Sequence, residues 1–438
     1  MRDEAARRPT LRGVRDSSEL GGRVVSTGAS TFLPDRLAER TPEGPIAVAD
    51  DLELGRGRWL LVLQVAEALL ASAVVEEGEG FRRARVGDGV AETLVALTAA
   101  GRERAGFSFR RLGEIGPWTG ERPIDVDQSN ESVVVGERAV VKRWIWLAPD
   151  NRRPTVLPEH LVAAGFTEMP VPLGHAVWHH GAGVAPIATV ATYLPDARDG
   201  WDWYVDLVDR SIDDPSVDAV EPAAALGALT ARLHVALATP SLVLPSPSAT
   251  AHQDDVAEWR REAERDLAAA LTSIDGEEGR RLHERERAIR AALSRLPVRQ
   301  TTTIPIHGDL HVGQFLRWRD GLAVSDLDGD PLGLGGLSGS PAKDVAGLVQ
   351  SLDHVGRIVE RRRGVSISGW VHDAVGQSLR AYRAELADRG AGSLFDEELL
   401  APLRVAQELH EFVYSASYLP GWRYVPDRSL AALLGTDG

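Results

Sequence analysis

Two short acidic segments near residue 310 carry the residue types that phosphoryl transfer requires. The first, at 306–314, reads Ile-His-Gly-Asp-Leu-His-Val-Gly-Gln, and the second, at 326–330, reads Asp-Leu-Asp-Gly-Asp. In such a reaction one carboxylate takes the proton from an acceptor hydroxyl, while an amide oxygen and a second carboxylate hold Mg²⁺ against the phosphates of a nucleotide. We therefore expect the two segments to form one site for a magnesium-bound nucleotide and an alcohol.

A β-hairpin must bring the two segments together. An apolar run from Gln314 to Trp318 is followed by Asp320-Gly321 and by a second apolar run from Leu322 to Val324. Asp-Gly between two short apolar runs is a strong signal for a hairpin. A solvated turn is the alternative interpretation of three carboxylates within five residues. Asp326, however, follows a run of the buried type, where an unpaired charge is costly, and a divalent cation is the partner that we expect for it.

The two segments resemble the catalytic and metal-binding loops of the aminoglycoside phosphotransferase-like kinases, which are relatives of the protein kinases. In those loops a His-Gly-Asp sequence, here ending at Asp309, is followed five residues later by Asn or Gln, here Gln314, and a second loop supplies an Asp, here Asp326. The resemblance implies that Asp309 is the catalytic base and that Gln314 and Asp326 hold Mg²⁺. It also implies that Asp328 is a further metal ligand or orients a water, and it gives Asp330 no defined role.

The composition narrows the classes of partner and compartment. The chain has 438 residues, a formal net charge of -15 and no cysteine. The negative charge argues against nucleic acid and anionic membranes as main partners, and the lack of cysteine excludes disulfides, thiolate metal sites and cysteine nucleophiles. Residues 1–16 lack the apolar stretch of a signal peptide, and the longest apolar run, 59–75, is too short and too polar to span a bilayer. We therefore expect a cytoplasmic protein.

Residues 1–113 are expected to form an amino-terminal cap subdomain, because a cap precedes the nucleotide lobe in the resembling kinases. This segment carries no recognisable chemistry. Its apolar patterns predict strands at 46–54, 58–65, 81–86 and 90–97, and a strand or a helix at 66–76.

Residues 114–199 are expected to form a β-rich nucleotide-binding subdomain. Lys142 lies in an apolar strand after the tight turn Gly136-Glu137, and a Lys in such a strand needs an anionic partner, which the phosphates of ATP would supply. A Lys at a strand edge that faces water is the alternative. A predicted helix at 158–164 carries Glu159, and the pairing of a strand Lys with a helix Glu is a recurrent feature of kinases.

Other residues of this subdomain are predicted to contact the nucleotide. The polar loop 127–132 lacks the Gly-x-Gly-x-x-Gly pattern of protein kinases, so its side chains and backbone N–H groups would contact the phosphates; a plain polar turn is the alternative. A strand at 189–194 leads to the Pro/Asp/Gly linker 195–200, the predicted boundary between lobes, and adenine would bond backbone groups near the end of this strand. The predicted contacts are Ser129, Asn130, Ser132, Ala191 and Tyr193.

Residues 200–438 are expected to form a mainly α-helical carboxy-terminal lobe. The resemblance then implies an α+β protein with the bilobal fold of the protein kinases. Asp344 lies near the start of one predicted helix, where capping is the default role; in the resembling kinases an Asp here braces the catalytic loop, and we assign it that structural role. Other helices are predicted at 222–238, 252–296 (as two helices that meet near Asp275-Gly276), 368–389, 396–418 and 428–434.

The last long helix and the aromatic segment after it are the predicted acceptor site. Carboxylates bond hydroxyls and protonated amines, and an aromatic ring packs against the C–H face of a sugar. A surface helix followed by a Trp packed in the core is the alternative. The segment 407–422 resembles the carboxy-terminal sugar-binding segment of the actinobacterial glucosamine kinases, and the order of parts along the chain also fits the maltokinases. The predicted sugar contacts are Gln407, Glu408, Glu411, Tyr414 and Trp422, together with Asp309.

These features together predict an ATP- and magnesium-dependent sugar kinase. By the resemblance, the acceptor is the 6-hydroxyl of glucosamine. Maltokinase, which makes maltose 1-phosphate, is the first alternative, and an aminoglycoside phosphotransferase is the second. A non-catalytic pseudokinase that binds a sugar or a partner is a different class, against which the intact base, both metal ligands and Lys142 argue. The sequence does not indicate an oligomeric state.

Overall fold

The chain divides into two compact units, which are described separately. The amino-terminal unit comprises Met1–Val156 and Pro170–Leu194, and the carboxy-terminal unit comprises Leu157–Met169 and Pro195–Gly438. The predicted linker 195–200 thus begins where the chain enters the carboxy-terminal unit for the second time. The computed structural model describes residues 22, 24, 29–34, 44–104, 106–124, 130–181, 183–297, 299–330 and 336–436.

The first sheet of the amino-terminal unit is antiparallel and five-stranded, in the order β1-β2-β3-β10 with β4 beside β3. Strand β2 is buried on both faces: Leu60 and Val62 pack in one cluster, whereas Leu61 and Leu63 pack in another with Phe32. The strands predicted at 46–54 and 58–65 are confirmed, and the ambiguous segment that follows them is a strand. The bounds are β1 (Ile46–Gly55), β2 (Arg58–Val65), β3 (Ala68–Glu77), β4 (Gly80–Arg83) and β10 (Trp146–Leu147).

The second sheet of this unit is seven-stranded, in the order β5-β6-β11-β12-β9-β8-β7, and all its pairs are antiparallel. Strands β5 and β6 lie before residue 113, so this sheet begins inside the segment predicted as a cap; the three-part division of the chain stays a prediction. The bounds are β5 (Glu103–Arg104), β6 (Phe107–Arg111), β7 (Glu121–Pro123), β8 (Glu131–Val135), β9 (Ala139–Arg143), β11 (Pro172–His180) and β12 (Gly183–Thr192).

The prediction of a strand at 90–97 is wrong, because this segment lies in helix α2 (Val90–Ala100). Its buried residues recur at helical spacing, and short apolar runs do not distinguish a strand from a helix. The helix start is stabilised from a distant part of the chain: the carboxylate of Glu121 accepts hydrogen bonds from the backbone N–H groups of Gly89 at 3.1 Å and Ala91 at 2.7 Å. The N-cap residue itself, Gly89, has no side chain that could cap the helix.

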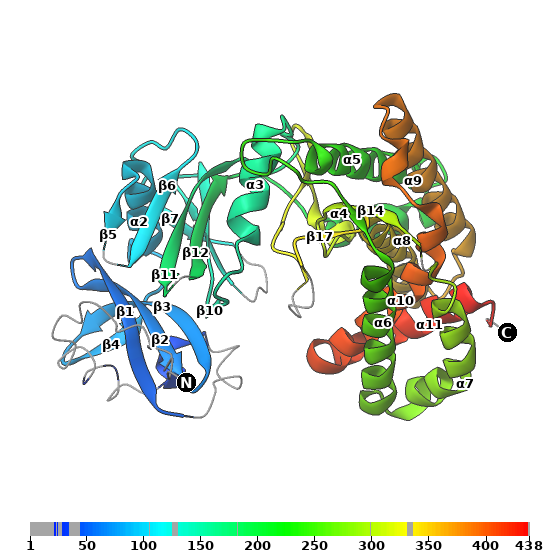
Figure 1. The fold of residues 1–438 in the computed structure, drawn as a ribbon, viewed down its shortest axis with the longest axis horizontal. Helices are drawn as coiled ribbons and strands as arrows, with labels where there is room; N and C mark the ends of the chain where they lie inside the picture. Colours follow the sequence, from blue (N-terminus) through cyan, green and yellow to red (C-terminus); the bar gives the residue numbers. More distant parts are fainter. Residues whose placement is uncertain are drawn as a thin grey trace, which may run out of the picture. The chain divides into compact units, whose positions relative to one another are not determined.

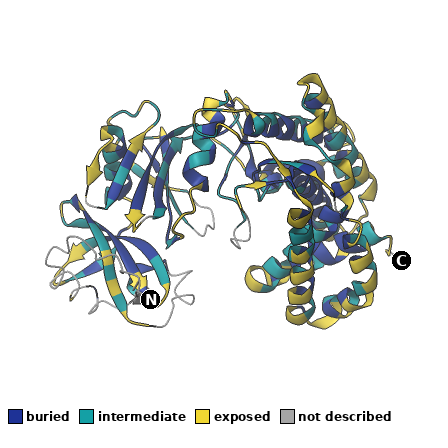
Figure 2. Ribbon diagram, viewed as in Figure 1, coloured by how far each residue is buried: buried dark blue, intermediate teal, exposed yellow. Residues whose placement is uncertain are grey.

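The carboxy-terminal unit is mainly helical, as predicted, and helix α8 lies at its centre in contact with α4, α5, α9, α10 and α11 (Figure 1). Buried residues line the inner faces of these helices, whereas their outer faces are exposed (Figure 2). The predicted break near residue 275 separates α6 from α7. The helix bounds are α3 (Arg153–Ala163), α4 (Gly200–Asp213), α5 (Glu221–Ala238), α6 (Gln253–Ser273), α7 (Gly276–Leu293), α8 (Pro341–Arg363), α9 (Ser368–Asp388), α10 (Leu400–Tyr418) and α11 (Tyr424–Leu434).

Short strands and 3₁₀ turns complete this unit. The predicted hairpin is confirmed as β15 and β16, and because Trp318 pairs with Gly321 its turn residues are Arg319 and Asp320. The bounds are β13 (Ala249–Ala251), β14 (Thr301–Pro305), β15 (Phe315–Trp318), β16 (Gly321–Val324), β17 (Ser338–Gly339), η3 (Val312–Gln314), η4 (Gly392–Leu394), η5 (Glu397–Leu399) and η6 (Pro420–Trp422), while η1 (Ala29–Phe32) belongs to the amino-terminal unit.

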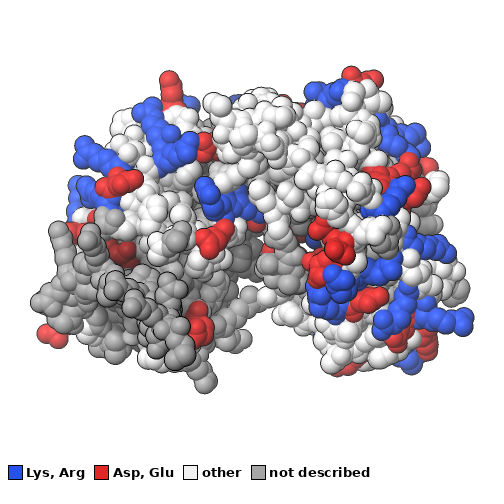
Figure 3. Space-filling model, viewed as in Figure 1, with Lys and Arg blue, Asp and Glu red and all other residues white. Residues whose placement is uncertain are grey.

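The charged faces of α6 and α7 carry local ion pairs, including Arg280 with Glu284 and Arg290 with Glu286, each at i,i+4 spacing. On the face drawn in Figure 3, basic and acidic side chains are intermixed over the helical unit. Among the described residues, no helix is long and apolar enough to cross a membrane.

Candidate active site

The loop that follows β14 carries the predicted base and is anchored by a buried histidine. His307 has no exposed surface, and its Nε2 donates to the backbone oxygen of Ser325 at 2.9 Å. This bond ties the loop to the segment that follows β16. Gly308 has a φ of 82°, a left-handed conformation that glycine adopts without steric cost, so the chain turns directly before Asp309.

Asp344 braces this loop, as the resemblance implied. Its Oδ2 accepts a hydrogen bond from the N–H of His307 at 2.7 Å, and its Oδ1 accepts one from the N–H of Gly308 at 2.8 Å. Burial would raise the pKa of Asp344, but the hydrogen bond from His234 and those from the loop amides lower it below its usual value. Ser340 caps helix α8, so capping is not the role of Asp344.

The carboxylate of Asp309 lies in an acidic cluster. Burial raises its pKa well above the usual value for an aspartate, and the negative charges of Asp326, Glu411 and Asp330 raise it further, whereas His410 lowers it. These neighbours come from the segment after β16 and from helix α10. The structure therefore brings together the predicted base, a predicted metal ligand and a predicted acceptor residue, which lie far apart in the sequence.

Gln314 ends the short turn η3, and His311 is the cap residue directly before it. The Nδ1 of His311 accepts a hydrogen bond from the N–H of Gly313 at 3.1 Å, and its Nε2 lies 3.3 Å from the side-chain nitrogen of Gln314. Burial lowers the pKa of His311 to about 4, so the ring is neutral at pH 7. His311 and Asp309 therefore do not form an ion pair, although Nε2 lies 3.9 Å from Oδ2 of Asp309.

Asp326 is exposed and has a φ of 59°, an uncommon conformation for a residue other than glycine that often marks functional sites. The N–H of the preceding residue, Ser325, donates to the backbone oxygen of Gln314 at 2.8 Å. Mg²⁺ in nucleotide sites takes one or two carboxylates together with phosphate oxygens and waters, and the amide of Gln314 and the carboxylate of Asp326 fit such a site. Asp328 lies in the same segment, half-buried. Within the part of the chain that the structure describes, no three His, Cys, Asp or Glu side chains form a metal site by themselves.

Glu411, whose charge acts on Asp309, is bonded to Gln407, whereas Trp422 and Tyr414 contact other aromatic rings. The side-chain nitrogen of Gln407 donates to Oε1 of Glu411 at 3.1 Å, which joins these two residues into one polar group beside Asp309. Trp422 lies edge-on to Trp201, with ring centroids 5.9 Å apart. The ring of Tyr414 lies 4.9 Å from that of Tyr418, one turn further along α10.

Glu408 is the predicted acceptor residue that the structure places differently. Its side chain has no exposed surface, and its Oε1 accepts hydrogen bonds from Nε2 of His354 at 3.0 Å and from the amide of Gln350. Burial lowers the pKa of His354, but Glu408 outweighs this and raises it to about 9, so His354 is protonated at pH 7, while burial raises the pKa of Glu408 above its usual value. A carboxylate enclosed in this way does not reach a sugar in this conformation. We correct its role to a structural one, in the contact between α10 and α8.

His410 belongs to the site, although no sequence pattern singled it out. Its Nδ1 lies 3.7 Å from Oδ2 of Asp266 on α6, and its Nε2 lies 3.4 Å from Oδ1 of Asp330. Burial would lower the pKa of His410, but these two carboxylates raise it to about 10. The imidazolium therefore joins α10 and α6 to the end of the acidic segment. Its position between two glutamates of one helix was the only local signal.

The amino-terminal unit places two predicted phosphate contacts side by side. Ser132 on β8 pairs directly with Lys142 on β9, and directly paired residues of antiparallel strands project from the same face of a sheet. The Nζ of Lys142 lies 5.8 Å from the ring of Trp144. Glu159 belongs to the other unit, so its pairing with Lys142 stays a prediction. Ser129 lies outside the described residues.

The predicted adenine contacts lie at the end of β12. Ala191 pairs with Val140 on β9. The N–H of Tyr193 donates to the backbone oxygen of Arg138 at 2.9 Å, and its hydroxyl accepts from Arg122 at 2.9 Å. The N–H of Tyr193 is thus already bonded within the unit, and binding of adenine by the backbone near Ala191 and Tyr193 stays a prediction.

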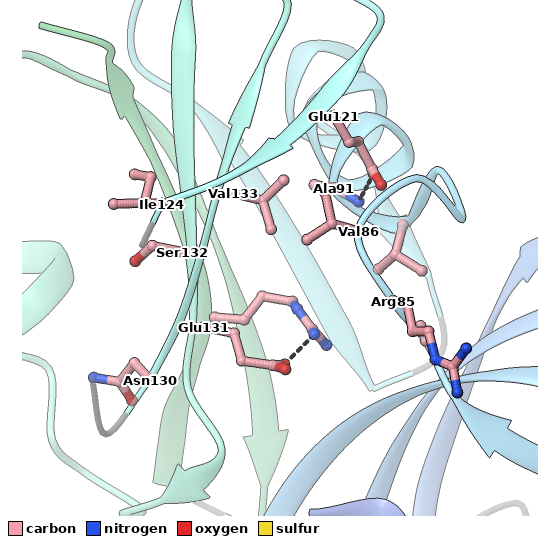
Figure 4. Close-up of a pocket in the computed structure, with 12 residues that line it drawn as sticks. Arg85, Val86, Ala91, Glu121, Ile124, Asn130, Glu131, Ser132 and Val133 are labelled. Carbon is pink, nitrogen blue, oxygen red and sulfur yellow. Dashed lines mark hydrogen bonds and ion pairs between the residues drawn. The ribbon is translucent and has the colours of Figure 1, made fainter. Parts of the chain in front are cut away.

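A cavity of ≈ 160 Å³ borders Asn130 and Ser132 (Figure 4). Glu121, which caps α2, forms part of its wall, and the ion pair between Glu131 and Arg143 lies within it. Burial lowers the pKa of Arg143 to about 10. Two of the predicted phosphate contacts therefore border open space, and Glu121, Glu131 and Arg143, which also line it, are engaged with the protein.

Comparisons with known proteins give close matches along nearly the whole chain. A glucosamine kinase of Streptacidiphilus jiangxiensis is 41% identical over 431 residues, covering 94% of this chain and 97% of the relative. A glucosamine kinase of Mycolicibacterium smegmatis is 36% identical over 405 residues, covering 88% and 98%. A solved structure of a glucosamine kinase superposes with a TM-score of 0.80 at 39% identity, covering 95% of this chain and 99% of that one.

A second solved structure of a glucosamine kinase contains bound ligands. It is a glucosamine kinase in complex with glucosamine, ADP and inorganic phosphate, with a TM-score of 0.76 at 39% identity, and it covers 94% of this chain and 99% of its own. No protein-family model matches the sequence. The likeness confirms the predicted α+β kinase fold, with its strand-rich amino-terminal part and its helical carboxy-terminal part.

Proposed function

This chain belongs to the glucosamine kinases, and we propose that it transfers the γ-phosphoryl group of ATP to the 6-hydroxyl of D-glucosamine. The observation that carries the proposal within the molecule is the acidic cluster around Asp309, where Asp326 and Glu411 both act on one carboxylate. A base, a metal ligand and a group that attracts an ammonium are therefore near neighbours, as phosphoryl transfer to an amino sugar requires.

Asp309 is the proposed catalytic base. Its raised pKa suits a group that must accept a proton from the acceptor hydroxyl, since general bases work best when their pKa lies close to the working pH. The Asp344 brace fixes the loop backbone next to it through two amide hydrogen bonds. Most of the rate enhancement would then come from holding the hydroxyl in line with the phosphoryl group.

Gln314 and Asp326 are the proposed Mg²⁺ ligands, with Asp328 as a further ligand. When bound, Mg²⁺ neutralises charge on the transferring phosphoryl group. Lys142 and Ser132, neighbours on one sheet face, are proposed to bind the phosphates with Asn130 and Ser129. The support for Glu159 is its place on the helix that follows the Lys142 strand, where it would orient that Lys. Ala191 and Tyr193 are proposed to bind adenine through their backbones.

The acceptor is proposed to lie against Gln407, Glu411 and Trp422, with Tyr414 at the border. Glu411 would pair with the ammonium group of the sugar, and such charge-assisted hydrogen bonds are stronger than neutral ones. Trp422 would pack against the C–H face. The Mg²⁺ requirement, the cytoplasmic location and the division into cap, nucleotide-binding and helical parts belong to the same proposal.

A coupled assay of ADP release tests the function. Purified protein with ATP and Mg²⁺ would be supplied in turn with glucosamine, glucose, maltose, N-acetylglucosamine and kanamycin, and the phosphorylated position would be read by ³¹P–¹H NMR. We expect glucosamine to be the best acceptor and N-acetylglucosamine to be poor, because acetylation removes the positive charge. Turnover of maltose but not glucosamine would overturn the proposal, as would binding of ATP with Mg²⁺ without turnover of any sugar.

A further inference from the structure

Four rings form a continuous series of contacts across the candidate site. The rings of His311 and Trp201 are stacked, with centroids 5.6 Å apart and planes at 29°. Trp201 meets Trp422 edge-on at 5.9 Å and 81°, and Trp422 meets His354 edge-on at 6.2 Å and 87°. The series therefore runs from the turn that contains the proposed metal ligand Gln314 to the proposed sugar-stacking residue. Aromatic pairs at these distances and angles are favourable beyond their buried area.

Trp201 itself is fixed against the metal-binding turn. A Cβ atom placed on Gly313 would lie 2.5 Å from the indole nitrogen of Trp201 and 2.8 Å from Cε1 of His311, so only glycine leaves room for this stack. One on Gly200 would lie 1.9 Å from the backbone oxygen of Val312, which shows how closely the start of α4 approaches η3.

The chain just before Trp201 is also bonded to the hairpin. Arg198 and Arg317 exchange two backbone hydrogen bonds, each 2.9 Å long. The first turn of α4 is therefore joined to η3 and β15 by backbone bonds and by close backbone packing. Trp201 projects from a firmly held segment, and its indole can act as a fixed surface for the imidazole of His311.

The tilt of the His311 ring decides how Gln314 is held. A neutral imidazole has one nitrogen that accepts and one that donates. The N–H of Gly313 and the side-chain amide of Gln314 approach the two different nitrogens, so the ring cannot accept from both. Because Nδ1 accepts from Gly313, Nε2 of the neutral ring carries the proton and can donate only to the amide oxygen of Gln314, whose second lone pair stays open to a metal; the ring plane therefore sets how that oxygen is oriented. The stacked indole of Trp201 restricts that plane.

We propose that Trp201 is a positioning residue that couples the acceptor site to the metal site, by holding His311 against Gln314 on one side and Trp422 on the other. In this proposal Trp201 contacts neither the sugar nor the nucleotide. The inference rests on the proposed function, because Gln314 and Trp422 have their assigned roles only there. A sugar that packs against Trp422 would then restrict Trp201 and His311, and would favour the Gln314 orientation that binds Mg²⁺ with the nucleotide.

The test compares Trp201→Leu and Trp201→Phe with Trp370→Leu as the matched control. Trp370 is a partly buried Trp of the same unit, on α9, where its indole nitrogen donates to the backbone oxygen of Ala219 at 3.0 Å. The main measurement is calorimetric titration of ADP with Mg²⁺, with and without saturating glucosamine, which needs no turnover. Steady-state kinetics give the Mg²⁺ concentration for half-maximal rate and the acceptor KM.

In the wild type, we expect glucosamine to tighten the binding of Mg²⁺–ADP. Trp201→Leu should abolish this tightening and raise the half-maximal Mg²⁺ concentration by about tenfold to a hundredfold, the usual effect of losing a group that orients a metal ligand. Trp201→Phe, which keeps a stacking ring, should restore most of both. Trp370→Leu should keep both, even if it lowers the melting temperature.

The proposal is overturned if glucosamine does not affect Mg²⁺–ADP binding in the wild type, or if Trp201→Leu retains the effect. It is also overturned if Trp201→Phe behaves like Trp201→Leu while both remain folded. If Trp201→Leu does not fold, Trp201→Phe still decides, because it should retain most but not all of the tightening. Failure of the proposed function gives a different result, because the wild type would then bind no glucosamine or transfer no phosphate to it.

Discussion

The backbone N–H of His307 donates to Oδ2 of Asp344 across thirty-seven residues of sequence, at 2.7 Å. The adjacent N–H of Gly308 donates to the other oxygen of the same carboxylate at 2.8 Å. The first turn of α8 thus fixes the backbone just before Asp309. A loop held by two charge-assisted bonds does not need reorganisation each time a substrate binds.

Replacing Asp344 with Asn should therefore weaken both the fold and the reaction. The amide offers one acceptor oxygen, so one of the two loop N–H groups loses its partner in a buried place. We expect the free energy of unfolding to fall by about 1–3 kcal/mol and kcat to fall more than ADP affinity. Urea unfolding and turnover measure the two effects. Asp373→Asn, at an exposed position of α9, is the control. Wild-type stability in Asp344→Asn would show that the brace is unimportant.

Replacing Asp309 with Asn should remove turnover but leave nucleotide binding largely unchanged. The amide keeps the size of the side chain and cannot accept the proton of the acceptor. We expect kcat to fall roughly a hundredfold to ten-thousandfold, and calorimetry should give a similar Kd for Mg²⁺–ADP. Asp320→Asn in the hairpin turn, exposed and remote from the cluster, is the control. If nucleotide binding is lost instead, Asp309 is a metal ligand and not the base.

The pH dependence of kcat/KM should show that the neighbouring carboxylates raise the pKa of Asp309. Asp309 must be ionised to act, so activity is lost as the pH falls through its pKa. Burial and the charges of Asp326, Glu411 and Asp330 raise that pKa, so the acid limb should lie above the usual range of an aspartate. Glu411→Gln removes one like charge and should move the limb to lower pH. If the acid limb does not move, the charge of Glu411 does not affect the pKa of Asp309.

The local patterns in the sequence were sufficient for the hairpin and most helices. Asp-Gly between apolar runs gave β15 and β16, and helical spacing gave α5, α9 and α10, because each signal lies within the element itself. Helix α2 was missed because its start is stabilised by Glu121, about thirty residues later, and a short apolar run fits either period. Short-range reasoning fails where the deciding contact is distant.

The same limit applies to the candidate site. The proposed base and metal ligands were identified from a compact motif whose chemistry requires fixed spacing, and their roles stay predictions. His410, Trp201 and His354 act through partners that lie far away in the sequence, and single His or Trp residues carry no spacing signal. Glu408 shows the converse: helical spacing placed it near the acceptor face, but spacing does not give depth, and the side chain is fully enclosed.

The His410 bridge should make stability depend on pH in a defined window. Its pKa is raised from 6.5 to about 10, so its contribution is fully present below pH 6.5 and is lost as the pH rises through about 10. Relative to His410→Gln, the wild type should be more stable by on the order of 1–3 kcal/mol near pH 6, and this difference should shrink towards pH 10. Urea unfolding at several pH values measures it.

A matched control for His410 is His283→Gln, because His283 is exposed on α7. That variant should follow the wild type at every pH. If the stability difference between the wild type and His410→Gln is the same at pH 6 and pH 10, the imidazolium is not what links Asp266 to Asp330, and the bridge acts by packing alone.

Glu408 and Glu411 lie three residues apart on α10, yet their replacement by Gln should have opposite consequences. Glu408→Gln removes the carboxylate that keeps the buried His354 protonated and breaks the buried pair, so the free energy of unfolding should fall by about 3–5 kcal/mol. Glu411→Gln should change stability by less than about 0.5 kcal/mol, as is usual for partly exposed positions. It should instead raise the acceptor KM roughly tenfold or more, since a charge-assisted bond to the ammonium is lost, while the KM for ATP changes less.

The double variant Glu408→Gln with His354→Gln separates charge from shape in this comparison. It removes both buried charges and keeps groups that can hydrogen-bond, so it should recover part of the stability that Glu408→Gln loses. Its acceptor KM should stay within a few-fold of the wild type if Glu408 acts only from beneath the helix. A large rise in acceptor KM without loss of stability in Glu408→Gln would instead mean that this carboxylate reaches the sugar after α10 rearranges. The two variants thus distinguish a carboxylate that supports the acceptor helix from one that binds the acceptor.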